Sequence, residues 1–299
     1  MINIFVTGCT CRTGVGRYLV ERLSSKADIL ITCLVRKESN VDWTIGLRNV
    51  RRVYGSLNEF DTFSAYIGET DVVVHIAGIR RALSVIRAMK ELEVNRGIFV
   101  NTTGLFSKFR VASEEYRIIE SEMIERLQNS QIKYAIIRPT MIYGNGRDNN
   151  VRKIALYLNK HAFFPIFGDG SALIQPVYYE DVAKALLALL ENEQCWGEAY
   201  NISGRKPITY KRFIEIIAEA IGRKVKFVKL PLFPIVTSVS LLNKIIPGFP
   251  IKSEQLLRTT EDRAFDYKDA QECFGYDPIS FEEGIRLEVE ELKKGGYLK

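Results

Sequence analysis

Metal-binding and disulfide-forming side chains are scarce in this sequence. Its 299 residues include two histidines and five cysteines, and only Cys9 and Cys11 lie close together, in a C-x-C spacing. This pattern matches neither the C-x-x-C of a zinc or redox site nor an even disulfide framework. His161 has no second ligand at metal-binding spacing. We therefore expect no metal site, and five free thiols in a reducing cytosol.

Long uninterrupted apolar runs are also missing. The most apolar stretch, residues 227–251, is broken by Lys229, Lys244 and several prolines. These interruptions argue against a membrane-spanning helix and leave a lipid-facing or lid helix as alternatives. The first residues, MINIFVT, run directly into a strand pattern and lack the features of a signal peptide. The sequence thus predicts a cytoplasmic protein without a transmembrane segment.

The sequence has no long basic or acidic run. Its 42 Lys and Arg exceed its 36 Asp and Glu by only six. A nucleic-acid-binding protein would need a concentrated basic face, so we expect no nucleic-acid partner. A modest positive potential suits a small ligand that carries phosphate.

The first half of the chain alternates apolar, β-branched runs with segments of helical period. Runs that are apolar on both faces, such as DVVVHIA at residues 71–77, are typical of a parallel sheet covered by helices on each side. This alternation predicts an α/β fold with a doubly wound, Rossmann-like parallel sheet, whose ligand lies at the carboxyl ends of the strands. The expected strands span residues 2–7, 29–35, 52–54, 72–76, 98–101 and 134–138, and the expected helices span residues 16–23, 82–92, 116–128, 181–190 and 211–221.

After about Tyr143 the pattern changes to helices mixed with loops that are marked by Gly and Pro. No repeat or polar linker separates the two halves. We expect residues 1–165 to form a dinucleotide-binding domain and residues 166–299 a smaller, mostly helical substrate-binding portion that packs partly on it. Candidates for the substrate cleft are Tyr143, Gln175 and Tyr178, although a polar loop at a domain junction explains them equally well.

A Gly-rich turn, TGCTCRTGVG at residues 7–16, joins the first predicted strand to the first helix. Gly8 suits a sharp turn, Gly14 the approach of the backbone to a pyrophosphate, and Gly16 close packing of helix on strand, while the helix amides donate to the anion. In this position the turn predicts a dinucleotide site. The other residues of the turn that we expect to contact the cofactor are Cys11, Arg12, Thr13 and Val15.

Arg36 stands at the end of the second predicted strand, where an NAD-preferring protein usually carries Asp or Glu for the ribose hydroxyls. An arginine there, with Arg12 as a second candidate, suits the 2′-phosphate of NADP. We therefore expect NADP to be favoured over NAD. A solvated surface arginine is the alternative.

Together these motifs resemble the extended and atypical short-chain dehydrogenase/reductases, the NAD-dependent epimerase/dehydratase-like group that contains nucleotide-sugar epimerases, dehydratases and reductases. The resemblance covers nearly the whole chain. Besides the turn it rests on VHIAG (residues 74–78), VNTTG (100–104), RPTMIYG (138–144), QPVYYEDVA (175–183) and YNISG (200–204). It implies cofactor contacts at His75, Ala77, Gly78 and Pro139, although a lone histidine in an apolar strand is more often structural.

The resemblance also implies hydride transfer on a substrate like a nucleotide sugar, with a Ser or Thr after the fifth strand and a Tyr-x-x-x-Lys on the next helix. Thr102 or Thr103 would orient the substrate and Tyr116 would be the proton donor. The residue four positions after Tyr116 is Glu120 instead of Lys. A carboxylate beside a phenol disfavours the phenolate. The candidates to replace the missing cation are Lys108 and Arg117.

Three functional hypotheses remain open. The first is an NAD(P)-dependent epimerase/dehydratase or reductase with a small-molecule substrate. The second, which Glu120 favours, is a dinucleotide-binding sensor, regulator or accessory subunit without turnover. The third is a scaffold without cofactor, because five residues lie between Gly8 and Gly14, more than is usual for the resembled family. Similar folds often form homodimers through the helices expected here at residues 82–92 and 116–128.

Overall fold

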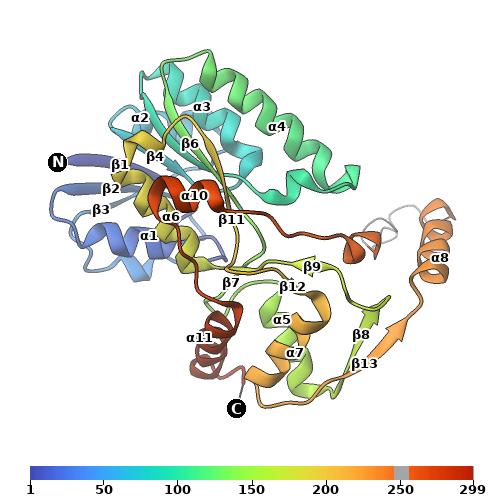
Figure 1. Cartoon of the computed structure of the whole chain (residues 1–299). Coiled ribbons are helices and arrows are strands. Elements are labelled where there is room, and N and C mark those ends of the chain that lie inside the picture. The colour runs from blue at the N-terminus through green and yellow to red at the C-terminus, as the bar shows by residue number, and fades with distance from the viewer. Residues whose placement is uncertain (246–255, 299) are drawn as a thin grey trace.

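Seven parallel strands form the centre of the molecule. The computed structural model describes residues 1–245 and 256–298, and its main sheet has the order β11-β6-β5-β4-β1-β2-β3 (Figure 1). This order confirms the predicted doubly wound, Rossmann-like fold. The strands are β1 (Ile2–Thr7), β2 (Ile29–Val35), β3 (Val50–Tyr54), β4 (Val72–His75), β5 (Arg96–Val100), β6 (Lys133–Pro139) and β11 (Ala199–Ile202).

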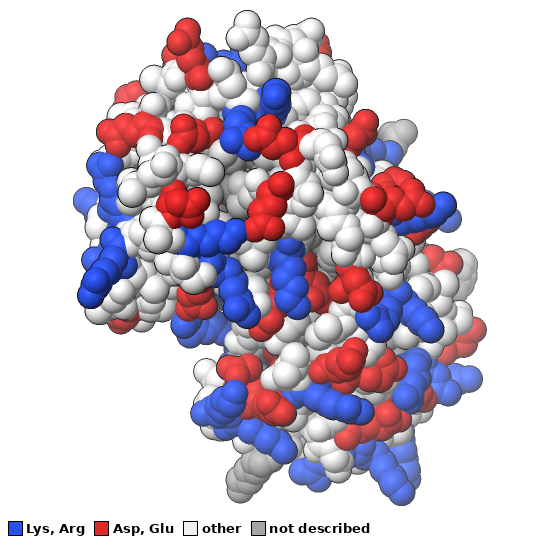
Figure 2. Space-filling model, turned by 60° about the vertical axis from the view of Figure 1, so that its left-hand side comes forward, with Lys and Arg blue, Asp and Glu red and all other residues white. Residues whose placement is uncertain are grey.

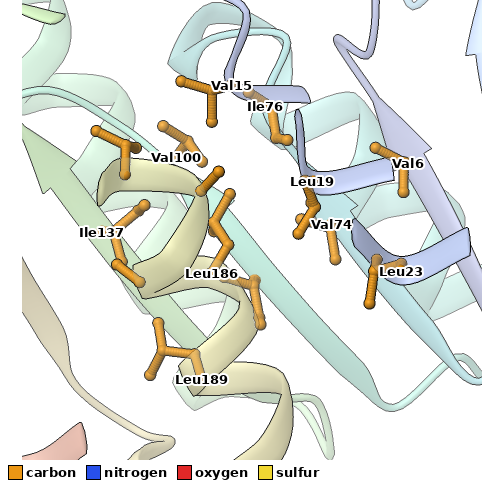
Figure 3. Close-up of a cluster of buried hydrophobic side chains, with 14 of the residues drawn as sticks. Val6, Val15, Leu19, Leu23, Val74, Ile76, Val100, Ile137, Leu186 and Leu189 are labelled. Carbon is orange, nitrogen blue, oxygen red and sulfur yellow. The ribbon is translucent and has the colours of Figure 1, made fainter. Parts of the chain in front are cut away.

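One face of this sheet is covered by α1 (Val15–Ser24) and α6 (Tyr179–Glu191). Figure 3 shows Leu19 of α1 and Leu186 of α6 close to sheet residues such as Val74. All three side chains are fully buried. Burying a leucine of this kind stabilises the fold by about 1.5 to 3 kcal/mol, so this layer holds α1 firmly against the strands.

The other face is covered by α3 (Ala82–Glu91) and α4 (Arg110–Gln128), with the short α2 (Ser64–Ile67) beside them. Neighbouring residues in a strand point to opposite faces, so Phe5 packs here while Val6 packs under α1. The expected helix at residues 116–128 begins earlier, at Arg110, shortly after the turn at residues 103–106 that follows β5.

A second, smaller core lies beyond the carboxyl edge of the sheet. It is built from α5 (Val151–Lys160), α7 (Tyr210–Ala220) and α11 (Phe281–Lys294). The remaining elements are the ribbons β7 (Ile142–Tyr143) with β10 (Val177–Tyr178), β8 (Phe163–Phe167) with β13 (Lys226–Leu230) and β9 (Leu173–Ile174) with β12 (Ile208–Thr209), and the helices α8 (Leu232–Ile245) and α10 (Lys268–Phe274).

The chain passes between the two cores more than once. α6 and β11 follow residue 165 and pack with the main sheet, whereas α5 precedes residue 165 and lies in the smaller core. The division between residues 165 and 166 therefore stays a prediction. No helix in the described ranges is both long and apolar enough to cross a membrane. Residues 246–251 of the apolar stretch lie outside these ranges.

The expectation of five free thiols is wrong for two of them. Cys195 and Cys273 form a disulfide across 78 residues, with their Cα atoms 5.8 Å apart. Cys9, Cys11 and Cys33 are free. The bond joins α10 to the turn before β11. Spacing along the sequence does not reveal this pair, because the fold alone brings its members together.

Thiol counting tests the disulfide directly. In urea without reductant, a maleimide should label three cysteines of the intact chain, and five after reduction, as read by mass spectrometry. Cys273→Ser should show four labels under both conditions, because Cys195 loses its partner. Five labels on the unreduced wild-type chain would contradict the pairing.

Candidate functional site

The Gly-rich turn brings α1 and β1 into backbone contact. A Cβ on Gly16 would lie 2.5 Å from the carbonyl oxygen of Gly8, and a Cβ on Gly8 would lie 2.8 Å from the amide nitrogen of Ala77. Gly14 adopts φ 79° directly before α1, in the left-handed region that favours glycine. These three positions leave the first amides of α1 at the carboxyl edge of the sheet, where an anion can accept from them.

A loop from the smaller core braces this turn. Asn145 adopts φ 61° and its side-chain amide donates to the carbonyl oxygen of Arg12, 2.8 Å away. The guanidinium of Arg12 donates to Asn149 at 3.4 Å, so this side chain is directed toward the loop. The amide of Gly146 in turn donates to the Glu288 carboxyl group of α11 at 2.8 Å.

A cavity of about 360 Å³ lies at the carboxyl ends of β1, β2 and β3. We call it the nucleotide pocket. Two arginines, Arg36 and Arg81, line it, and Arg36 is 71% exposed beside Glu38. The predicted cofactor residues in its lining are Gly8, Cys11, Arg36 and Ala77. The predicted residues that do not line it are Arg12, Thr13, Gly14, Val15, Gly16, His75, Gly78 and Pro139.

His75 is completely buried and has a structural position. Its Nε2 lies 3.0 Å from the carbonyl oxygen of Gly78, which can only accept, so Nε2 carries the proton. Nδ1 then accepts from the hydroxyl of Thr7 at 2.9 Å. Burial lowers the pKa of His75 to about 4, so the neutral ring ties β4 to the end of β1.

A second cavity of about 360 Å³ lies between the end of β5 and the segment at residues 258–265. We call it the substrate pocket. Thr102, Thr103 and Gln175 line it as predicted candidates. Gln175 is buried and holds the far wall, because its amide donates to Gly204 and accepts from the backbone of Phe265. Sequence reasoning missed Arg258, Glu261, Asp262, Arg263 and Phe265, which also line the pocket.

In the substrate pocket the acidic side chains have hydrogen-bond donors, whereas two arginines have a nitrogen without an acceptor among the described residues. Glu261 accepts from the Ser107 hydroxyl at 2.8 Å and from the Lys108 amide at 2.6 Å, and Asp262 accepts from the Leu173 amide. The Nε atoms of Arg258 and Arg263 are buried without a hydrogen-bond partner in the described part of the chain. Burial and the neighbouring Arg258 lower the pKa of Arg263. The pocket therefore suits an anionic ligand.

Tyr116 lies beside the turn that follows β5. A Cβ on Gly104 would be 3.5 Å from the Tyr116 ring and 3.3 Å from the Thr102 hydroxyl oxygen. The cation next to the phenol is Arg80, whose guanidinium lies 5.0 Å from the ring centroid and also pairs with Glu115. The two predicted substitutes lie elsewhere: Arg117 bonds to Ser113 and Lys108 lines the substrate pocket.

The charge of Glu120, which the sequence places one helical turn after Tyr116, is paired within the fold. Its carboxylate is buried, pairs with Arg138 at 2.6 Å and accepts from the Asn101 amide. This ion pair joins α4 to β6 at the carboxyl edge of the sheet. Arg138 thus compensates the negative charge that the sequence places at the position of the usual lysine.

Tyr143 and Tyr178 do not reach the substrate pocket. They are 1% and 4% exposed and pack with each other in the smaller core. The Tyr143 hydroxyl lies against Gly284 of α11, where a Cβ would be 2.0 Å away. The prediction that Tyr143 and Tyr178 line the substrate cleft is therefore wrong, because both side chains pack in the smaller core.

The chain matches the model of a protein family described as NAD(P)H-binding over residues 12–193, more than half of its length. The chain belongs to this NAD(P)H-binding family. Its fold agrees with the expected resemblance to the extended short-chain dehydrogenase/reductases, and the family match supports a nicotinamide dinucleotide as the cofactor.

Two curated relatives match parts of this NAD(P)H-binding chain. NADH dehydrogenase [ubiquinone] 1 alpha subcomplex subunit 9, mitochondrial, of Arabidopsis thaliana is 30% identical over 47% of this chain and 35% of its own. Short-chain dehydrogenase/reductase family 42E member 1 of Danio rerio is 27% identical over 49% of this chain and 42% of its own. The chain thus spans less than half of either relative.

Among solved structures, the UDP-glucose 4-epimerase of Thermotoga maritima, determined with UDP-glucose, superposes with a TM-score of 0.73. It covers 98% of this chain and 99% of its own, at 19% sequence identity. At that identity the likeness establishes the shared fold.

Glu288 makes the brace on the Gly-rich turn dependent on pH. Burial, with a smaller contribution from the neighbouring Asp148, raises the pKa of Glu288 to about 8, although the hydrogen bond from the Gly146 amide acts in the opposite direction. Its ordinary value is 4.5, so between these pH values the folded chain keeps a proton that the unfolded chain has released. The free energy of unfolding should therefore fall as pH rises through this window.

Glu288→Gln should remove this dependence, because a neutral amide still accepts from Gly146. At pH 8 the variant should exceed the wild-type protein in unfolding free energy by roughly 2 to 4 kcal/mol. Urea unfolding at pH 5 and pH 8 measures it, with the exposed Glu290→Gln as control. Equal pH slopes for the wild-type protein and Glu288→Gln would refute this account.

Proposed function

We propose that this protein is an NAD(P)-dependent hydride-transfer enzyme acting on an anionic substrate with an alcohol or carbonyl group, such as a nucleotide sugar. The observation that carries the proposal is the grouping of Thr102, Tyr116 and Arg80 beside the substrate pocket. Fold likeness to an epimerase is a weaker argument, because one fold hosts many activities.

The nucleotide pocket and the Gly-rich turn would hold the cofactor. The glycine contacts leave no room for side chains where the backbone must approach a pyrophosphate, and Arg36 with Arg81 suits a 2′-phosphate. We propose that NADP is preferred for this reason. The bound cofactor supplies or accepts the hydride.

The chain's own residues would orient the substrate and move its proton. The Thr102 hydroxyl already accepts from the Gly104 amide, which leaves its proton for a substrate oxygen. Tyr116 would exchange the proton with that oxygen, and Arg80 over its ring would stabilise negative charge there. Arg258 and Arg263 would bind the substrate's anionic group.

A second candidate function is cofactor binding without turnover, as in a sensor or accessory subunit. The ion pair between Glu120 and Arg138 supports it, because both side chains occupy the region in which the resembled enzymes place a free lysine. The relative from Arabidopsis thaliana carries the name of a subunit of a larger complex. Glu120→Lys does not separate the two functions, since it would set a lysine against Arg138.

Cytoplasmic location and homodimer formation also remain proposals. The exposed Ile118 on α4, 61% accessible, supports a contact between two copies through α3 and α4. The Cys195–Cys273 disulfide argues against a strongly reducing location in most organisms. A reduced pair in freshly lysed cells would therefore support the cytoplasmic location, and an oxidised pair would argue against it.

Calorimetric titration of the cofactor-free protein tests the nucleotide preference. NADPH should bind more tightly than NADH, and Arg36→Ala should weaken NADPH binding about 10-fold because a charge-assisted contact is lost. Affinity for NADH should change little. The neighbouring exposed Lys37→Ala is the matched control. If Arg36→Ala lowered the affinities for NADPH and NADH equally, Arg36 would not contact the 2′-phosphate.

Absorbance at 340 nm tests turnover. Nucleotide sugars and other anionic alcohols or carbonyl compounds are added to the protein loaded with NADP or NADPH. With an active substrate, Tyr116→Phe should lower kcat about 100-fold or more without changing cofactor affinity. An unchanged rate in Tyr116→Phe would exclude its role. Absence of any redox change across the screen would favour the non-turnover function.

A further inference from the structure

The chain's excess positive charge is concentrated around one segment. Residues 220–245 contain no Asp or Glu and five basic residues. Removing these five from the chain's 42 Lys and Arg leaves 37, against 36 Asp and Glu. The remaining sequence is therefore nearly neutral, and on the face shown in Figure 2 its positive and negative side chains are interspersed. Residues 220–245 thus differ from the rest of the chain in carrying basic residues without any acidic ones.

The same segment exposes apolar side chains. Phe233 near the start of α8 is 82% exposed, and Pro231 and Pro234 beside it are exposed as well. The hydroxyl groups of Thr237 and Ser238 donate to backbone carbonyls four residues earlier, each at 2.9 Å. Hydroxyl groups bonded in this way have their donors satisfied inside the helix and do not require water.

The ribbon that leads to α8 combines the same two properties. Val228 on β13 and Phe163 on its partner β8 are 47% and 49% exposed. Lys226 and Lys229 of β13 are exposed among them. Figure 1 shows β13 running to the edge of the molecule, with α8 standing away from both cores. Basic and apolar side chains are thus exposed together on a projecting part of the chain.

We propose that residues 223–240 dock on the surface of an anionic lipid bilayer. Basic residues are attracted to anionic headgroups, and exposed apolar side chains such as Phe233 enter the interfacial region. The 14 residues of α8 span about 21 Å, less than the roughly 30 Å of the hydrocarbon layer, so the helix lies on the membrane. A second copy of the chain is a poorer occupant, because two segments free of acidic residues repel each other.

Co-sedimentation of the full-length chain with vesicles tests this docking. The protein should sediment with vesicles of phosphatidylcholine and phosphatidylglycerol and remain in solution with phosphatidylcholine alone. Removing two charges in Lys226→Gln/Lys229→Gln should lower the partition coefficient roughly 30-fold. Phe233→Ser should lower it about 10-fold or more. Raising the salt from 0.1 M to 0.5 M should weaken binding.

Matched variants separate docking from general surface effects. Lys90→Gln/Lys133→Gln removes two exposed charges elsewhere, and Ile45→Ser removes an apolar side chain that is 73% exposed. Both should bind anionic vesicles like the wild-type chain and retain its NADPH affinity. The proposal would be overturned if the wild-type chain bound neutral and anionic vesicles equally well. It would also be overturned if the control variants lost as much vesicle binding as the test variants, or if Phe233→Ser left vesicle binding unchanged. The proposal would also be overturned if the wild-type chain did not bind vesicles but formed a dimer in solution that Phe233→Ser dissociated.

Discussion

The contact between Gly16 and the Gly8 carbonyl sets the position of every other part of the nucleotide site. With no side chain between them, α1 lies directly on β1, and β1 lies in the sheet between β4 and β2. The first amides of α1 therefore point across the carboxyl edge of the sheet, where the ends of three strands form the nucleotide pocket. A methyl group on Gly16 would push the helix away from β1, and one on Gly8 would meet the backbone of Ala77 after β4.

The second site is organised by charges that come from separate parts of the chain. Glu120 occupies the place of an expected cation, yet its partner Arg138 on β6 makes the local pair neutral. The cation near Tyr116 comes from Arg80, before α3, and the cations of the substrate pocket come from residues 258–263. A departure from the resembled motif at one position is thus accompanied by rearranged charges around it, which is compatible with either proposed function.

The strands of the main sheet could be predicted largely from sequence, because buried β-branched runs between amphipathic helices have few alternatives. β1 and β2 have the predicted bounds, whereas β11 was not predicted because YNIS at residues 200–203 is short and follows a helix and a loop. Tyr143 and Tyr178 were misplaced since a motif gives their position in the chain and not the direction of their side chains. Arg80 and the Cys195–Cys273 pair depend on contacts between segments distant in sequence, which periodicity does not report.

The brace from Glu288 through the loop at residues 144–149 to Arg12 connects the last helix of the chain to its first turn. A shortened protein that ended after α10 would still contain all seven strands and every glycine of the turn. It would nevertheless lack the carboxyl group that receives the Gly146 amide, and the loop that holds the long turn in place would lose its support. The support of the nucleotide site is therefore complete only after α11 has been synthesised and has folded against this loop, so a turn near residue 12 waits for residues 281–294.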